Sequence, residues 1–119
     1  MDYEITPREL FTLGADAQIL DVRTRHEFEA GHIAGARNIP VDRFPGYEHL
    51  LDSSRPVLVV CQVGLRSDMA ATYLLAKGFV AHNVRGGVDG WLDDGFPLVG
   101  PGGGPGVMID PWPGAMPVT

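Results

Sequence analysis

The feature that most constrains the fold of this chain is an unbroken apolar run, Val57-Leu58-Val59-Val60, which is followed by Cys61. β-Branched residues favour strands, and apolar side chains at every position rather than at alternate ones indicate a strand buried on both faces. Such strands lie inside parallel sheets that helices cover on both sides. The run therefore predicts an α/β fold.

The segments around this run alternate between helical and strand-like patterns. Thr6 and Thr24 each stand three residues before a glutamate, the spacing of a capping box at a helix N-terminus, and the clearest helical periodicity lies in residues 67–77. The other predicted elements are strands over residues 18–22, 36–39 and 80–84, a helix over residues 42–51 and a short turn carrying Trp91. Alternating strands and helices with short connections indicate one parallel sheet in one domain.

Charge and composition exclude several classes of function. The chain has 119 residues and a formal net charge of -6, and Lys and Arg form no run, so we expect neither a nucleic-acid partner nor an anionic membrane surface. No apolar stretch reaches the roughly 18 residues that span a bilayer, and Met1-Asp2-Tyr3-Glu4 lacks the pattern of a signal peptide. We therefore expect a cytoplasmic protein. Its single cysteine cannot form an internal disulfide, which leaves the thiol free for chemistry.

Residues 100–119 differ from the rest of the chain because eleven of these twenty residues are Gly or Pro. Such a composition does not build regular structure of its own. Val107-Met108-Ile109 and Trp112 nonetheless supply apolar surface that could dock on a groove of this molecule or of a neighbour. We expect a folded domain over residues 1–99 and a C-terminal tail over residues 100–119 that is either docked or disordered.

Cys61 stands where the buried strand ends and a loop leads into the helix over residues 67–77. At such a junction, backbone N–H groups and the positive end of the helix dipole point toward one place and stabilise a thiolate or a bound anion. Arg66 adds a permanent positive charge. Ligands of parallel sheets bind at the carboxyl ends of the strands. Cys61 is therefore a candidate nucleophile.

Five groups of residues stand in a recognisable order along the chain. They are Leu20-Asp21-Val22-Arg23; the pair Glu27-Phe28; Gly31-His32-Ile33-Ala34-Gly35-Ala36-Arg37-Asn38-Ile39-Pro40; Cys61-x-x-Gly64-x-Arg66-Ser67; and Gly86-Gly87 followed by Trp91 and Gly95-x-Pro97. In this order they resemble the single-domain rhodanese family, the thiosulfate or thiol sulfurtransferases. The resemblance covers about Ile5 to Val99. It implies a central parallel sheet of about five strands with helices on both faces, and a cysteine that forms a persulfide.

The chemistry that the resemblance implies is sulfur transfer. The Cys61 thiolate would attack the outer sulfur of thiosulfate or a related donor and pass that sulfur to cyanide, to a thiol or to a protein acceptor. A helix N-terminus and a nearby cation lower a cysteine pKa, so no separate base is required. No cofactor is expected. The residues assigned to the site are Cys61 as nucleophile, the loop residues Gln62, Val63, Gly64, Leu65, Arg66 and Ser67 as the cradle for the anion or persulfide, and Asp21 and Arg23 as supporting residues.

Each of these assignments has an alternative. Cys61 could be a small buried hydrophobe, Arg66 could form an ion pair that only holds the loop, and Ser67 is expected to be a helix N-cap rather than a catalytic hydroxyl. Arg37 could face the same cleft. The four histidines show no metal-ligand spacing with Cys61, so no metal site is expected.

Three other functions remain open at this point. The first is a cysteine phosphatase, a class whose active-site loop resembles the pattern Cys-x5-Arg. In this chain only four residues separate Cys61 from Arg66. The shorter loop gives a smaller cradle, which suits one sulfur atom better than a phosphoryl group. A noncatalytic rhodanese-like binding module is the second alternative, and the intact Cys61 and Arg66 argue against it. The third is a persulfide carrier that serves a biosynthetic partner.

Overall fold

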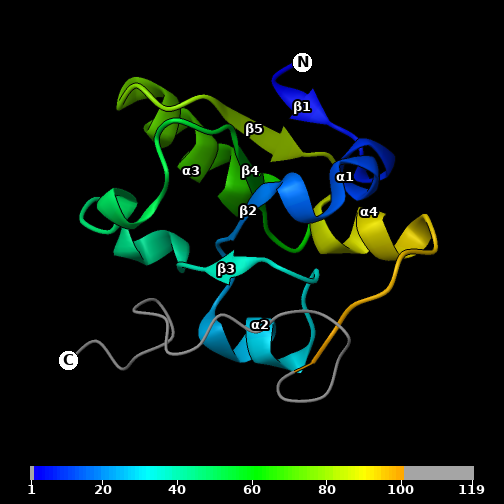
Figure 1. The fold of residues 1–119 in the computed structure, drawn as a ribbon. Helices are drawn as coiled ribbons and strands as arrows, with labels where there is room; N and C mark the ends of the chain where they lie inside the picture. The colour runs from blue at the N-terminus through cyan, green and yellow to red at the C-terminus, as the bar shows by residue number, and fades with distance from the viewer. Residues whose placement is uncertain (1, 101–119) are drawn as a thin grey trace.

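The computed structural model describes residues 2–100, which form a five-stranded parallel sheet with helices on both faces (Figure 1). The strands are β1 (Glu4–Ile5), β2 (Gln18–Asp21), β3 (Arg37–Asn38), β4 (Val57–Val60) and β5 (Ala81–Val84), in the spatial order β1-β5-β4-β2-β3. The α-helices are α1 (Pro7–Leu13), α2 (Arg25–Ala30), α3 (Leu65–Ala76) and α4 (Gly87–Asp93). The short 3-10 helices are η1 (Gly14–Asp16), η2 (Val41–Arg43) and η3 (Glu48–Leu50). The predicted α/β fold and its sheet of five strands are confirmed.

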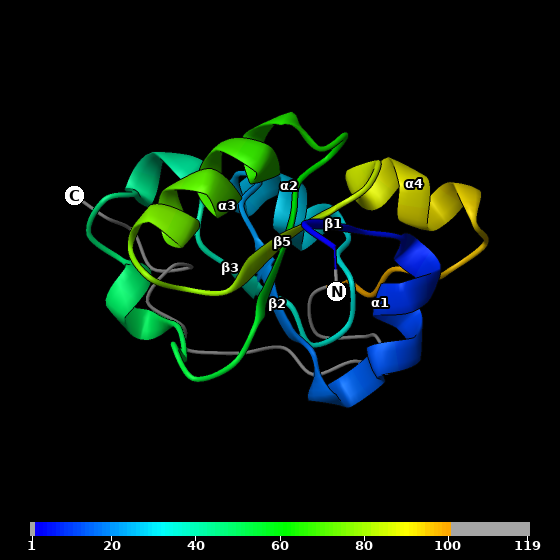
Figure 2. The same ribbon diagram turned by 90° about the horizontal axis from the view of Figure 1, so that it is seen from above.

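Strand β4 is the centre of the sheet and is buried on both faces, as its sequence predicts. It pairs with β2 on one side and with β5 on the other. Val57 and Val59 pack in one core with the small residues of α3, while Leu58 and Val60 pack in a second core with side chains of α1, α2 and α4. Figure 2 shows α3 on one side of the strands and α1 and α4 on the other.

Both predicted capping boxes are present and set the starts of α1 and α2. The Thr6 hydroxyl accepts a hydrogen bond from the Glu9 amide, and the Glu9 carboxylate accepts one from the Thr6 amide. Thr24 and Glu27 make the same reciprocal pair at the start of α2. Two amides that the helix itself leaves unpaired are satisfied in each case.

The predicted helix over residues 42–51 is wrong. This segment instead contains η2 and η3, which are separated by a turn through Pro45 and Gly46. Proline lacks the amide hydrogen that a helix interior needs, and Gly46 has a φ of 134°, far from helical values. Trp91 is also placed differently from the prediction, because it lies within helix α4 rather than in a turn.

The tail prediction falls on residues 101–119, which lie outside the described part of the chain. Within residues 2–100, no helix combines the length and the apolar character that crossing a membrane requires.

Candidate active site

The loop after β4 is held in shape by the start of helix α4. The Val88 amide donates to the Cys61 carbonyl at 2.8 Å, and the Asp89 amide donates to the Gln62 carbonyl at 3.0 Å. Gly87 allows this approach, since a Cβ atom at that position would lie 2.3 Å from the Cys61 carbonyl oxygen. The Gly86-Gly87 motif therefore shapes the loop that carries Cys61.

Gly64 turns the loop into helix α3. It is the N-cap residue of α3 and has a φ of 110°, in the left-handed region that favours glycine. Its amide points back to Cys61 and donates to Sγ at 3.1 Å. The turn therefore brings the N-terminus of α3 against the sulfur atom.

The Cys61 sulfur is buried but hydrogen-bonded, with only 1% of the residue exposed. Its second polar neighbour is the Ser67 hydroxyl, whose Oγ lies 3.3 Å from Sγ. Burial raises the pKa of the Cys61 thiol, but hydrogen bonds from Ser67 and from the amides of Gly64 and Val63 outweigh it and hold the pKa below its ordinary value. The site therefore favours the thiolate, which is the nucleophilic form of cysteine.

Ser67 does not cap helix α3, so that prediction is wrong. Gly64 takes the N-cap position, and Ser67 lies in the first turn with its side chain fully buried. The Ser67 hydroxyl donates to Oδ1 of Asn83 at 2.6 Å, and Nδ2 of Asn83 donates to the Gly64 carbonyl at 3.2 Å. Ser67 and Asn83 thus link the sulfur atom to strand β5.

Arg66 forms a two-pronged ion pair with Glu27 of helix α2. Its two terminal nitrogens donate to Oε1 and Oε2 of Glu27 at 2.7 and 3.0 Å. The hydrogen bond from Arg66 is the main cause that lowers the pKa of Glu27 to about 2, so the carboxylate is charged at neutral pH. The structural ion pair considered as an alternative for Arg66 is therefore present.

Asp21 and Arg23 form a second, buried ion pair that joins three parts of the site. The Nε and one terminal nitrogen of Arg23 donate to the Asp21 carboxylate, with the closest distance at 2.9 Å. Arg23 also donates to the Gly31 carbonyl at 2.7 Å and to Oε1 of Gln62 at 3.2 Å. The pair therefore connects the end of β2, the end of α2 and the Cys61 loop.

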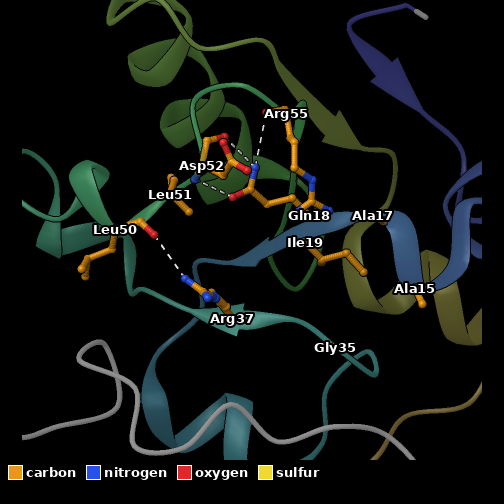
Figure 3. A pocket seen from close by; sticks show the side chains of 10 residues that line it. All are labelled: Ala15, Ala17, Gln18, Ile19, Gly35, Arg37, Leu50, Leu51, Asp52 and Arg55. Atoms are coloured by element: carbon orange, nitrogen blue, oxygen red, sulfur yellow. Dashed lines mark hydrogen bonds between the residues drawn. The ribbon is translucent and has the colours of Figure 1, made fainter.

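Arg37 does not face the cleft that holds Cys61. It lines a pocket of about 420 Å³ together with Gln18, Asp52 and Arg55 (Figure 3). Gln18 begins β2 and pairs in register with Val57, so this pocket lies at the amino ends of the strands, whereas Cys61 follows the carboxyl end of β4. This pocket and the thiol are thus at opposite ends of the parallel strands.

A smaller hollow of about 310 Å³ lies beside the loop itself and is lined by residues that include Val63, Gly64, Leu65 and Asn83. Val63 and Leu65 line it with 55% and 75% of their surface exposed, next to the carboxylates of Glu4 and Asp68, and Met69 in helix α3 exposes 67%. Across residues 2–100, no group of three His, Cys, Asp or Glu side chains is arranged to hold a metal ion.

Comparison with known proteins agrees with this geometry. The family model described as rhodanese-like domain matches residues 7–94. The chain belongs to the rhodanese-like domain family. A rhodanese-related protein from Thermoplasma volcanium has a solved structure that is similar to this rhodanese-like domain, with a TM-score of 0.78 and 30% identity over 82% of this chain and 98% of the other.

Two curated relatives of this rhodanese-like domain are bacterial proteins. The thiosulfate sulfurtransferase GlpE of Stutzerimonas stutzeri is 36% identical over 78 residues, which cover 65% of this chain and 72% of that protein. The uncharacterized protein YqhL of Bacillus subtilis is 41% identical over 76 residues, which cover 63% of this chain but only 60% of the relative's length. The name of the GlpE relative supports a sulfurtransferase type of rhodanese domain.

The sequence does not indicate every residue that contributes to the site. In the sequence Glu27 stands out only as part of a capping box and of a family motif, and its spacing after Thr24 places its carboxylate at the start of α2. Asn83 carries no local signal in the sequence, because it reaches the site through the pairing of β5 with β4.

Proposed function

We propose that this rhodanese-like domain is a sulfurtransferase that carries sulfane sulfur as a persulfide on Cys61. The observation that supports it most is the environment of Sγ, with the Gly64 amide at 3.1 Å, the Ser67 hydroxyl at 3.3 Å and the N-terminus of α3 beside it. These groups favour an anionic sulfur and hold it at the end of a buried strand. The names of relatives such as GlpE support the same chemistry.

The proposed reaction has two displacement steps at sulfur. In the first, the Cys61 thiolate attacks the outer sulfur of thiosulfate or a related donor, the S–S bond of the donor breaks, and sulfite leaves with the electron pair. In the second, cyanide or a thiolate attacks the terminal sulfur of the persulfide, and the Cys61 thiolate leaves. The amides of the loop from Gln62 to Arg66 would stabilise the negative terminal sulfur in between.

A transfer assay with Cys61→Ser tests this proposal. The substitution exchanges sulfur for oxygen at a site of similar size, so the protein is expected to fold while sulfur transfer from thiosulfate to cyanide falls to the uncatalysed rate. Retained transfer would refute the role of Cys61. A persulfide that forms but passes to no small acceptor would instead favour a carrier that serves a protein partner, and a cysteine that never gains sulfur would favour a noncatalytic binding module.

The contacts of Arg66 do not support the phosphatase alternative. The guanidinium of Arg66, which would have to bind the phosphoryl oxygens, already binds both oxygens of Glu27. We therefore expect no turnover of aryl phosphates that depends on Cys61. Phosphatase activity that disappears in Cys61→Ser would contradict this expectation.

A further inference from the structure

The cations next to the Cys61 loop are charge-compensated by neighbouring carboxylates. Arg23 pairs with Asp21, and Arg66 pairs with Glu27 through two hydrogen bonds of 2.7 and 3.0 Å. Each guanidinium still has N–H groups that can donate, but the net charge of each pair is zero. An anion is then attracted only by the loop amides and by the N-terminus of helix α3, and both act over a short range.

Further negative charge lies around the same loop. Asp68 stands in the first turn of α3 and lines the hollow beside Gly64, and Asp89 accepts a hydrogen bond from the side chain of Gln62. A donor that approaches Cys61 therefore meets two paired cations, two further carboxylates and the thiolate itself. A doubly charged anion is repelled by this surrounding field twice as strongly as a singly charged one.

Exposed apolar side chains beside the loop point to the same kind of donor. Val63, Leu65 and Met69 leave more than half of their surface exposed around the start of α3. Apolar side chains do not stabilise the binding of a hydrated sulfonate, but they can bury an organic group that is attached to the sulfur.

We infer that Glu27 determines donor specificity: by neutralising Arg66 it makes the site favour a sulfane sulfur donor with at most one negative charge and an organic body over the dianion thiosulfate. The inference rests on the proposed function of Cys61. The favoured class comprises thiosulfonates and persulfides of thiols. With a thiosulfonate, the Cys61 thiolate attacks the outer sulfur, the S–S bond breaks, and a sulfinate leaves with the electron pair.

Methanethiosulfonate and thiosulfate form a matched pair of probes, because a methyl group in the first replaces one charged oxygen of the second. Glu27→Gln removes the charge that neutralises Arg66 and keeps the capping box, since Gln serves as well as Glu at that position. Glu29→Gln is the control, because Glu29 lies on the same helix but pairs with Arg25 at the surface. The measurement is kcat/KM for persulfide formation on Cys61 with each probe, normalised to the reaction of that probe with a small free thiolate.

For the unaltered protein we expect a normalised kcat/KM about tenfold higher with methanethiosulfonate than with thiosulfate. In Glu27→Gln the value for thiosulfate should rise about tenfold and that for methanethiosulfonate about threefold, because a dianion feels the removed charge twice as strongly. Glu29→Gln should change neither, and added salt should weaken the discrimination.

Preference of the unaltered protein for thiosulfate would overturn the inference, as would equal gains, or no gain, for the two probes in Glu27→Gln. These outcomes leave the proposed function standing, since sulfur still reaches Cys61. If neither probe places sulfur on Cys61 in any variant, the proposed function fails and the inference fails with it.

Discussion

The hydroxyl oxygen of Ser67 lies between two polar partners, 2.6 Å from Oδ1 of Asn83 and 3.3 Å from the sulfur of Cys61. The amide of Asn83 is oriented by its other end, because Nδ2 donates to the Gly64 carbonyl at 3.2 Å. The hydroxyl has one proton and can donate it to only one of these two partners at a time. When Cys61 ionises, the hydroxyl must turn from Asn83 to the sulfur.

This relationship predicts the effect of Ser67→Ala on the reactivity of Cys61. The hydroxyl is one of the groups that lower the pKa of the thiol, so its removal should raise that pKa. A hydrogen bond to a charged group contributes about 1.5 to 3 kcal/mol, so alkylation by iodoacetamide at pH 7 should slow by roughly tenfold. At high pH, where Cys61 is ionised in both proteins, the two alkylation rates should converge. The exposed substitution Ser54→Ala is the control, and an unchanged pH profile in Ser67→Ala would contradict the role of the hydroxyl.

Gly64→Ala tests whether the conformation of the loop matters for sulfur loading. A Cβ atom on Gly64 would meet only ordinary contacts, so the cost comes from the positive φ of 110° and should be about 1 to 2 kcal/mol of stability. We expect lower unfolding stability in urea and slower persulfide formation. Gly35→Ala is the matched control, since Gly35 has a φ of 84° with open space around it. Gly35→Ala should lose a similar amount of stability but form the Cys61 persulfide at the normal rate. Equal rates of persulfide formation in the two variants would show that the conformation of the loop at Gly64 does not matter for sulfur loading.

Gly87→Ala should be more damaging than Gly64→Ala, for a different reason. The added methyl group would lie 2.3 Å from the carbonyl oxygen of Cys61, so the backbone of the loop or of α4 must move. We expect a loss of about 2 to 4 kcal/mol in the free energy of unfolding, together with slower alkylation of Cys61. A variant with the stability and alkylation rate of the unaltered protein would show that α4 does not shape the loop.

The ion pair of Glu27 predicts a difference in acid stability. Its pKa is lowered from 4.5 to about 2, so the stability that it contributes is present above pH 4.5 and is lost as the pH falls toward 2. Glu27→Gln lacks this contribution at every pH. The urea midpoints of the two proteins should therefore converge between about pH 4.5 and pH 2, while other carboxylates affect both equally. A difference in urea midpoint that stays constant across this range would show that the ion pair with Arg66 does not lower the pKa of Glu27.

The parts of the fold that local sequence encodes could be predicted from it. The capping boxes of Thr6 and Thr24 depend on residues three positions apart, and the burial of β4 follows from its own four side chains. The two-residue strand β1 is too short to carry a pattern and forms because β5 pairs with it.

The contacts of the site are long-range, which is why only part of it could be predicted. Cys61 and its loop stand together in the sequence, whereas Glu27 lies 39 residues before Arg66 and Asn83 lies 16 residues after Ser67. Nothing in the loop indicates that Arg66 already has a carboxylate partner. The packing of α2 and β5 against the loop decides that, and with it the charge that a donor meets.

Mass spectrometry of Cys61 after incubation with a sulfane sulfur donor is the most direct test of the central claim. The account predicts that the peptide containing Cys61 gains the mass of one sulfur atom, that cyanide or a thiol removes it, and that Cys61→Ser never acquires it. Failure of the intact protein to gain this mass with thiosulfate, with methanethiosulfonate and with a thiol persulfide would contradict the account.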